Sequence, residues 1–566
     1  MLGNVRLVVA LAAAGLAWLA FGRHLLSGWW LLVPGAGFVA LMGIHERVIR
    51  ARDRAARAAR FYQRALARIE DRWAGGGESG DRFLDPAHPY AQDLDLFGKG
   101  SLFELLSTAR TRAGEETLAR WLLGPASPEV VRERQAAVEE LRGRLDLREE
   151  LALLGEEVRA GVHSEALAKW GEAPPVLDSR AARAAAAILA SLAVVSLGVL
   201  FATGFRLLFL AVVPAEIAFA FWWRARVRHV VYSADQPGQD LALLSHVLAR
   251  LEREPFGAPR LVELRAAMTT QGEPPSRRIA RLDRLLVLLE SRHNAFFAPI
   301  AAALLWATQL AFAIEQWRRE SGGAIRRWLE AVGEMEALCA LAGYAYEHPS
   351  DPFPEFIAQS PYFDGEALAH PLLPASRAVA NDVRLDAGLR LLIVSGSNMS
   401  GKSTLLRTAG TNLVLAMAGA PVRARRVRLS PLALGASIRV VDSLQGGRSR
   451  FYAEITRIRL LVDLARGPLP LLFLLDELLH GTNSHDRRIG AAGVVRALVE
   501  RGGIGLITTH DLALADIAGT LSPPGANVHF QDHLEDGKIS FDYRLRPGVV
   551  TKSNALELMR SVGLEV

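Results

Sequence analysis

Cysteine and lysine are both scarce in this chain. Cys339 is the only cysteine among 566 residues, which excludes an intramolecular disulfide and fits a reducing compartment. It lies in an apolar helical pattern with no catalytic partner beside it, so we expect it to be buried. Only five lysines accompany 61 arginines, and the formal net charge is +6. A charge this small permits contact with nucleic acid or anionic lipid but does not demand either.

Apolar residues, in contrast, are abundant. They make up 50% of the chain, and the mean hydropathy is +0.17, which suggests membrane segments. Four apolar runs approach the roughly 20 residues that cross a bilayer core. They are Leu7–Phe21, Leu25–Ile44, Ala184–Phe205 and Leu207–Trp223. A cleaved signal peptide fits poorly, because a second long run follows the first at once. We therefore expect four transmembrane helices in two hairpins, in contact with a lipid bilayer.

The arginines predict the topology of these hairpins. Nine arginines lie between Arg47 and Arg72, two precede the second pair of runs, and three follow it at 224–228. The positive-inside bias places both termini and the large segments between and after the hairpins in the cytoplasm. The expected location is thus a cell (inner) membrane, crossed several times. Glu216 stands inside the fourth run, where an acid is a candidate functional residue; packing between helices, or a shallower helix, is the interpretation we favour.

A fifth apolar run, Ala295–Ile314, would make the number of membrane crossings odd if it also crossed the membrane. We call this the parity of the crossings. If it crossed the membrane, everything after it would lie outside the cytoplasm, away from ATP. We therefore predict a buried helix of the cytoplasmic part. Apolar residues at helical spacing predict helices elsewhere before residue 350.

A glycine-rich stretch follows the short apolar run Leu391–Val394. It reads Gly396-Ser397-Asn398-Met399-Ser400-Gly401-Lys402-Ser403-Thr404 and leads into a predicted helix. This is the G-x-x-x-x-G-K-[ST] pattern of a phosphate-binding loop (P-loop), in which glycines let backbone N–H groups face phosphate oxygens. Lys402 would reach the β- and γ-phosphates, and the Ser403 hydroxyl would bind Mg²⁺. Because lysine is so rare here, a chance match is less plausible than usual.

Two further apolar runs end in polar residues. Leu471–Leu475 ends in Asp476 and Glu477, as expected of a buried parallel strand whose carboxyl end meets a ligand. Asp476 would hold Mg²⁺ through water, and Glu477 would orient the attacking water. Ile504–Ile507 is followed by Thr508, Thr509 and His510, and His510 would sense the γ-phosphate or that water. The alternative is a pair of strands that simply end in solvent-facing polar groups.

Residues 442–454 predict a second anion site. Gly446, Gly447 and Ser449 stand at the start of a predicted helix, whose N-terminus attracts anions. This segment has no obvious route to the same nucleotide within one chain. A homodimer that buries ATP between the P-loop of one subunit and Ser449 of the other would use both features.

The order of these motifs resembles that of the MutS family of DNA mismatch-repair ATPases. The Asn-Met P-loop, Asp476-Glu477 followed by Gly481-Thr482, and Thr508-Thr509-His510 are similar to its ATPase motifs, and 447–454 resembles its signature helix. The resemblance covers about residues 95–170 and 235–566 and is strongest in the last 200 residues. The resemblance implies ATP and Mg²⁺ as cofactors, head-to-tail dimers and DNA as a partner. ATP-binding cassette transporters are the alternative, but only 74 residues separate Lys402 from Asp476, which hardly accommodates their helical subdomain.

We therefore predict a multidomain α and α/β protein. Its expected parts are a transmembrane hairpin (1–44), an arginine-rich helix and linker (45–94), an all-α core in two pieces (95–183 and 224–349), a second hairpin between them (184–223) and a MutS-like P-loop α/β domain (350–566). No mismatch-reading domain precedes the core. The expected function is ATP hydrolysis at a dimer interface, coupled to DNA binding; the alternative is a membrane transport or assembly ATPase without a DNA role.

Overall fold

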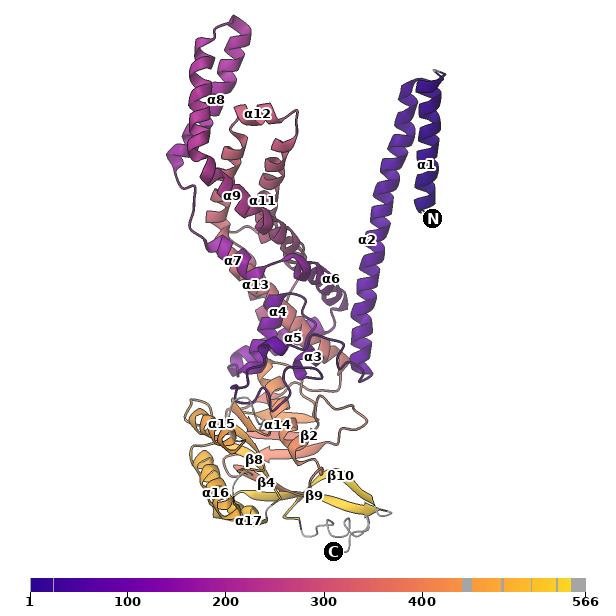
Figure 1. Cartoon of the computed structure of the whole chain (residues 1–566). Coiled ribbons are helices and arrows are strands. Elements are labelled where there is room, and N and C mark those ends of the chain that lie inside the picture. Colours follow the sequence, from indigo (N-terminus) through magenta and orange to yellow (C-terminus); the bar gives the residue numbers. More distant parts are fainter. Residues whose placement is uncertain are drawn as a thin grey trace. The chain divides into compact units, whose positions relative to one another are not determined.

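A computed structural model describes residues 2–23, 25–439, 450–479, 483–510, 512–535 and 538–550 (Figure 1). The chain divides into two compact units, residues 1–66 and residues 67–566, and each is described by itself.

The first unit consists of helices. Its elements are α1 (Leu2–Ala17), the short π-helix η1 (Trp18–Gly22), the 3₁₀ turn η2 (Gly28–Leu31) and α2 (Leu32–Ile69), which continues past the end of the unit. Large apolar side chains such as Leu7, Trp29 and Val39 are exposed to solvent along these helices. An apolar surface of this kind, without a protein partner over it, is typical of a membrane-facing segment.

Three helical segments among the described residues are long and apolar enough to cross a membrane. They are Gly28–Ile69, Arg180–Thr203 and Leu207–Arg253. The first predicted run, Leu7–Phe21, corresponds to the shorter apolar stretch Leu7–Gly22. These are statements of length and composition, so the four transmembrane helices stay a prediction.

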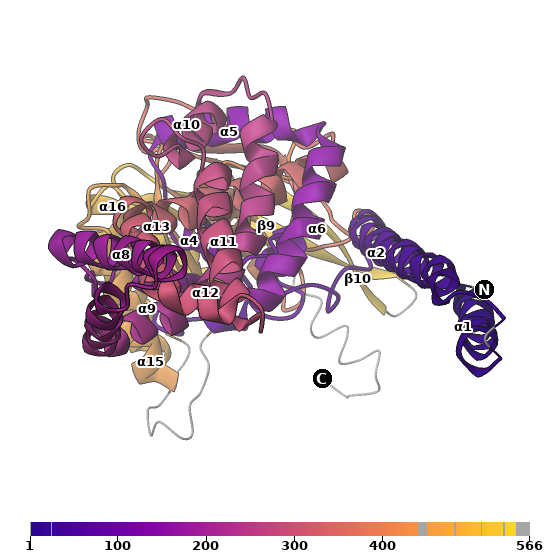
Figure 2. The ribbon, with the colours of Figure 1, turned by 90° about the horizontal axis from the view of Figure 1, so that it is seen from above.

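The predicted helical core is present in the second unit. Its helices before the second apolar hairpin are α3 (Leu102–Leu106), α4 (Arg112–Leu123), α5 (Pro128–Arg142), α6 (Leu145–Gly161) and α7 (Ser164–Glu172). The hairpin is formed by α8 (Arg180–Thr203) and α9 (Leu207–Arg253), and α10 (Pro259–Met268), α11 (Pro275–Glu290), the turn η4 (Ser291–His293), α12 (Ala298–Ala303) and α13 (Trp306–Glu347) follow. Helix α13 packs against α4, α5, α7, α9, α10 and α11, and so forms the centre of the core (Figure 2).

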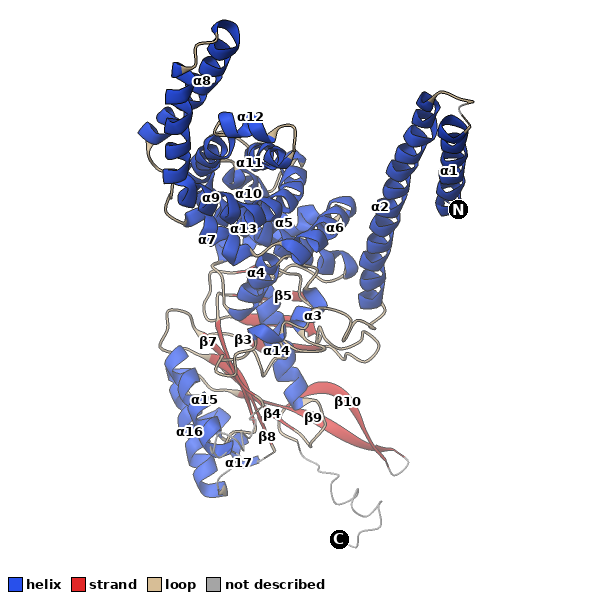
Figure 3. Ribbon diagram, turned by 45° about the horizontal axis from the view of Figure 1, so that its top comes forward, coloured by secondary structure: helices blue, strands red, loops and turns tan. Residues whose placement is uncertain are grey.

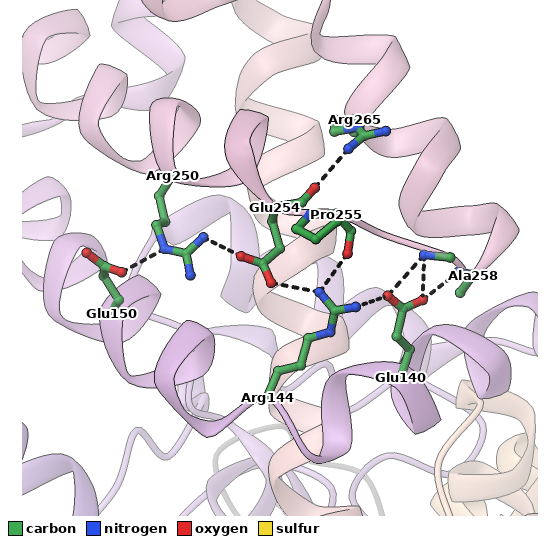
Figure 4. A network of polar contacts seen from close by, with 9 residues as sticks. Glu140, Arg144, Glu150, Arg250, Glu254, Pro255, Ala258 and Arg265 are labelled. Carbon is green, nitrogen blue, oxygen red and sulfur yellow. Dashed lines mark hydrogen bonds and ion pairs between the residues drawn. The ribbon is translucent and has the colours of Figure 1, made fainter.

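The hairpin helix α9 enters this core without a break. It runs from the apolar segment after residue 207 to Arg253, although the sequence predicts a boundary at 223. At its end, Glu254 accepts hydrogen bonds from Arg250 and Arg144, and Arg144 also binds Glu140 of α5 (Figure 4). Arg250 contacts Glu150 of α6 as well. A network of ion pairs therefore ties the end of α9 to α5 and α6.

The fifth apolar run is not the single buried helix that parity predicts. It divides between the short α12 and the start of α13, and the chain turns at Leu304–Leu305, where Leu305 has a φ of 46°. Phe296 is 93% exposed and Ile300 is 53% exposed, whereas the part after Thr308 is largely buried. Apolar residues do recur at helical spacing, but the positive φ at Leu305 interrupts the helix between α12 and α13. Only the α13 part is packed among the core helices.

The C-terminal part contains two sheets (Figure 3). The smaller has the strand order β1-β5-β2-β3, with β1 (Glu355–Phe356), β2 (Phe363–Leu368), β3 (Asn381–Leu385) and β5 (Arg426–Leu429). The larger has the order β10-β9-β4-β8-β7-β6, with β4 (Leu391–Ser395), β6 (Ala433–Ser437), β7 (Leu471–Asp476), β8 (Ile504–Thr509), β9 (Ala526–Glu535) and β10 (Lys538–Pro547). All neighbouring strands of the larger sheet are parallel except the edge pair β9–β10.

Helices cover both faces of the larger sheet. Along β7, Leu472 and Leu474 belong to the apolar cluster that includes α14 (Lys402–Ala418) and the helical core. Leu471, Phe473 and Leu475 belong to a second cluster with α15 (Arg450–Leu464), α16 (Ser484–Glu500) and the short helices α17 (Leu512–Ala515) and α18 (Ile517–Thr520). This alternation explains why the strand reads as a continuous apolar run. The overall class, multidomain α and α/β, agrees with the prediction.

Candidate functional site

The loop between β4 and α14 curls as a phosphate-binding sequence requires. Gly396, Met399 and Gly401 all have positive φ, at 149°, 68° and 103°. A Cβ at Gly396 would lie 2.9 Å from the Ser400 hydroxyl oxygen and 3.0 Å from the Phe530 carbonyl oxygen, so a larger residue would not fit without a shift. Glycine adopts such backbone angles at little cost. The loop therefore has its shape because glycines stand at the two positions that need them.

Lys402 is the first residue of α14 and is almost fully buried. Its Nζ donates to the carbonyl oxygens of Gly396 and Ser397, both at 2.8 Å, and lies 3.9 Å from Glu477 Oε1. Burial lowers the pKa of this amine, and the carboxylates of Glu477 and Asp476 act in the opposite direction. The ammonium group is thus held at the mouth of the loop, next to the end of β7.

Asp476, the last residue of β7, accepts two hydrogen bonds from different elements. The Ser403 hydroxyl of α14 donates to its Oδ2 at 2.6 Å, and the Thr508 hydroxyl of β8 donates to its Oδ1. Thr508 Oγ1 also accepts from the backbone N–H of Glu477 at 3.1 Å. The three neighbouring elements β7, β8 and α14 therefore meet at one carboxylate.

Glu477 and His510 lie together, as the order of the motifs predicts. His510 follows β8, and its Nδ1 is 3.5 Å from Glu477 Oε1. Glu477 has a backbone φ of 46°, an angle that residues other than glycine rarely adopt and that tends to occur at functional sites. The chain directly after Glu477 is held by Glu454 of α15, which is buried. The Glu454 carboxylate accepts a hydrogen bond from the Leu479 backbone N–H at 2.5 Å.

These groups line a cavity of about 720 Å³. The predicted residues Asn398, Met399, Gly401, Lys402, Ser403, Thr404, Asp476 and Glu477 all contribute to its wall. Gly396, Ser397, Ser400 and His510 are not among the lining residues. Ser449 lies outside the described residues, as do Gly446, Gly447 and Gly481–Thr482, so the proposed second anion site is a prediction only.

The cavity is also lined by residues that were not predicted to belong to the site. His370 follows β2, Asn381 begins β3, and Phe530 and Tyr543 belong to β9 and β10. Burial, with nearby Arg407 and Arg423, lowers the pKa of His370 to about 4, so its ring is neutral at pH 7. Asn381 donates to the Tyr543 carbonyl oxygen at 3.0 Å and accepts from the Leu545 N–H at 2.7 Å.

Tyr543 lies over the glycine-rich loop. A Cβ at Gly401 would be 3.1 Å from the edge of its ring. An aromatic ring and a neutral imidazole on one side of a cavity, with a lysine and carboxylates on the other, suit a ligand with both an aromatic base and phosphates. The stretches His370-Pro371-Leu372 and Asn381-Asp382-Val383 resemble the segment that precedes the ATPase motifs in MutS proteins, and this resemblance could have drawn attention to His370 and Asn381. No sequence signal marks Phe530 or Tyr543.

The residues present fit Mg²⁺ and a nucleoside triphosphate. The hydroxyl oxygens of Ser397 and Ser400 are buried and have no hydrogen-bond partner among the described residues, so the loop has spare polar groups. Ser403 and Asp476 offer two oxygen ligands side by side. The described residues contain no group of three or more His, Cys, Asp or Glu side chains that could hold a metal. Mg²⁺ would thus take most of its ligands from phosphate and water, as it commonly does.

Comparison with known proteins places this region in a family. The family described as MutS domain V matches residues 392–565. The DNA mismatch repair protein MutS of Natronomonas pharaonis is 33% identical over 258 residues, which are 44% of this chain and 29% of the relative. The DNA mismatch repair protein MutS 2 of Halobacterium salinarum is 29% identical over 259 residues, with the same coverage of both chains. The matched region thus spans only 29% of the length of these relatives. This C-terminal region, which holds the P-loop sequence and both acids, therefore matches domain V of the MutS family.

Proposed function

We propose that this protein is a membrane-anchored ATPase of the MutS kind, which binds and hydrolyses ATP with Mg²⁺ and couples hydrolysis to DNA binding. The observation that carries the proposal is the meeting of Lys402, Ser403, Asp476 and Glu477 in one cavity, at the carboxyl ends of neighbouring parallel strands. The domain V match and the curated relatives, both named as DNA mismatch repair proteins, support the same function.

Each residue of the site has a role that its position permits. Lys402 would release its two loop carbonyls and bind the β- and γ-phosphates. Ser403 and Asp476 would hold Mg²⁺, whose charge offsets that of the phosphates. Glu477 would accept a proton from the water that attacks the γ-phosphorus as the bond to the bridging oxygen breaks, and His510 would orient Glu477 or that water. Tyr543 and His370 would receive the adenine ring.

The chemistry is tested by replacing Glu477 with glutamine, which keeps the shape of the side chain but accepts no proton. We expect this variant to bind ATP and to lose turnover. Glu500, an exposed carboxylate at the end of α16, provides the matched control, and Glu500→Gln should hydrolyse ATP at the wild-type rate. Equal loss in both variants, or normal turnover in Glu477→Gln, would refute the assigned site.

A homodimer with the nucleotide shared between subunits is part of the proposal. It is tested by mixing two inactive variants, Lys402→Ala and Ser449→Ala. In a mixed dimer, one of the two sites combines the intact Lys402 loop of one subunit with the intact Ser449 of the other. Activity should therefore return on mixing, to a level below that of the wild type. If Ser449 acts within its own chain, mixing restores nothing.

The coupling to DNA separates this proposal from a transport or assembly ATPase. One observation favours the alternative: α9 is a single helix that continues from the apolar hairpin into the core, so the hairpin itself could be what the ATPase moves. Full-length protein in lipid vesicles should hydrolyse ATP faster with duplex, mismatched or branched DNA, and binding should weaken with salt. Turnover that depends on lipid and ignores every DNA structure would support the alternative instead.

A further inference from the structure

We infer that residues 294–314 form a re-entrant element, which enters the bilayer from the cytoplasmic side beside the α8–α9 hairpin and returns to the same side. This inference rests on the membrane anchoring proposed above. It adds a lipid-contacting segment to the two hairpins, formed by the sequence that was expected to be a buried helix of the cytoplasmic core. The element contains α12, the turn at Leu304–Leu305 and the start of α13.

The composition and the exposed surface of this segment suit lipid. No charged residue occurs between Asn294 and Ile314, while Glu290, Arg292 and His293 precede it and Glu315 follows it. Phe296 is among the most exposed large apolar side chains of the described chain, and Ile300 is also exposed. Exposed aromatic and aliphatic side chains on a six-residue helix and in the turn before it would be unfavourable in water. They are the side chains expected where a protein faces acyl chains.

The position of α12 along the hairpin indicates its depth. One cavity of about 740 Å³ is lined by α12, by Ala193 and Leu197 of α8, and by residues of α9 that include Phe209 and Glu216. Leu197 is six residues and Ala193 ten residues before Thr203, the last residue of α8. At about 1.5 Å per residue, the α8 residues that share this cavity with α12 lie roughly 9–15 Å from the hairpin turn, and on α9 the cavity extends from Phe209 to Arg224.

The arginines of the hairpin mark the boundaries of the membrane. Arg206 lies at the turn, and it would reach the headgroups of the far leaflet. Arg183 of α8 is 20 residues from Thr203, and Arg224 of α9 is 18 residues from Arg206. At the same helical rise, both lie roughly 27–30 Å from the turn, which is about the thickness of a hydrocarbon core. The α8 residues that share a cavity with α12 lie at a third to a half of this distance from the turn, so α12 borders a part of the hairpin that is inside the hydrocarbon core.

The protein itself supplies hydrogen bonds to much of the non-helical backbone of the segment. Lipid offers no partner to an exposed N–H, so non-helical backbone is tolerated only if the protein satisfies it. Phe296 N–H donates to Asn294 Oδ1, and Phe297 and Ala298 donate to the Asn294 carbonyl oxygen. At the turn, Leu304 and Leu305 donate to the carbonyl oxygens of Ile300 and Ala302, respectively. The indole N–H of Trp306 donates to the Leu288 carbonyl oxygen at 2.7 Å.

The element also accounts for Glu216. This acid is 6% exposed and lines the cavity shared with α12, and its Oε1 has no hydrogen-bond partner among the residues that the structure describes. On an isolated hairpin, its side chain would face acyl chains, which is costly for an acid. Here α12 covers it. The interpretation from sequence, packing between helices, agrees with this arrangement, although the covering helix comes from a distant part of the chain.

The chain is well suited to a fluorescence test of depth, because its single cysteine is buried in α13 and burial raises the pKa of its thiol to about 12. A cysteine introduced at the surface is then the reactive one. We would label Phe296→Cys in the element, Val195→Cys on the exposed face of α8 and Ile489→Cys on the exposed face of α16 with a nitrobenzoxadiazole dye. The full-length protein is placed in vesicles of phosphatidylcholine and phosphatidylglycerol, and quenching by aqueous iodide and by acyl-chain nitroxide lipids is measured.

If the inference is correct, dyes at 296 and 195 are quenched by nitroxide lipids and several-fold less by iodide than the dye at 489. Iodide quenching at 296 equal to that at 489, with 195 protected, overturns the element but leaves the anchoring intact. If iodide quenches the dyes at both 296 and 195 as strongly as the dye at 489, the result overturns the membrane anchoring as well as the re-entrant element. Protection at 296 without lipid quenching overturns the inference in favour of a second protein copy over this surface. Ile300→Cys should repeat the result for 296 if that substitution disturbs folding.

Discussion

Thr508 offers a stringent test of the site, because its single hydroxyl holds two acidic residues in position. The hydroxyl donates to Asp476 Oδ1 and accepts from the Glu477 backbone N–H, and the side chain is fully buried. Thr508→Val keeps the shape of the side chain and removes both interactions. Neither Asp476 nor Glu477 is changed, so the variant probes positioning alone.

The size of the effect follows from these two contacts. A hydrogen bond to a charged group contributes about 1.5–3 kcal/mol. If most of this free energy is lost in the transition state, in which Asp476 must hold Mg²⁺, kcat should fall by about 10- to 100-fold, because each 1.36 kcal/mol corresponds to a factor of ten. The KM for ATP should change far less, because Lys402 and the loop backbone are untouched.

The assay is steady-state ATP hydrolysis by full-length protein in vesicles, over a range of Mg²⁺ concentrations. Thr508→Val should need more Mg²⁺ for half-maximal rate, whereas a merely structural defect would lower the rate without this shift. Thr508→Ser retains the hydroxyl and should restore most of the activity. Wild-type kcat and Mg²⁺ dependence in Thr508→Val would refute our account of the Asp476 carboxylate.

Three further predictions concern stability and reactivity. A Cβ at Gly322 of α13 would lie 2.2 Å from the Gly171 carbonyl oxygen of α7, whereas a Cβ at Gly323 would meet no atom within 4 Å. In denaturant titrations, Gly322→Ala should therefore lower the free energy of unfolding by about 1–3 kcal/mol, and Gly323→Ala should raise it by up to about 1 kcal/mol. The pKa of His370 is about 4 in the folded protein and 6.5 in the unfolded chain, so the unfolded chain binds a proton more readily. The free energy of unfolding should therefore fall by about 2 kcal/mol as the pH drops from 7 to 5, and His370→Gln should lack this part of the pH dependence. Cys339 should react with maleimide only after denaturation; rapid labelling of the native protein would contradict its burial.

Local sequence was sufficient for the phosphate-binding half of the site. The glycines at 396 and 401, the apolar run of β7 before Asp476 and the next strand before His510 each carry their own signal, because strand, loop and helix follow directly in the chain. Parallel pairing of β7 with β8 then brings Thr508 opposite Asp476. The sequence implied this order but not the hydroxyl contact, since any small polar residue could end that strand.

The other half of the site was not predictable in the same way. Tyr543 reaches Gly401 only because β9 pairs with β4 and β10 with β9, and because the register of β10 shifts between Phe541 and Leu545. Such a bulge changes which side chains face the ligand, and single-sequence patterns do not reveal it. The same limit explains the error over the fifth apolar run. Its helical period is real, but the turn at Leu305 depends on packing against α8 and α9.

Helix α13 connects the two regions that carry the proposals. It is an uninterrupted helix of 42 residues, about 63 Å long at 1.5 Å per residue, which begins at the re-entrant element and ends before the first sheet. One continuous cluster of buried apolar residues surrounds it and extends to α14, directly behind the P-loop sequence. The ion pairs of Arg144 and Arg250 fix the end of α9 to α5 and α6, and α5 packs on α14. A close-packed interior transmits displacement more readily than it absorbs it. Movement of α14 on nucleotide binding would therefore reach the hairpin through packed helices, with no loose linker on the way.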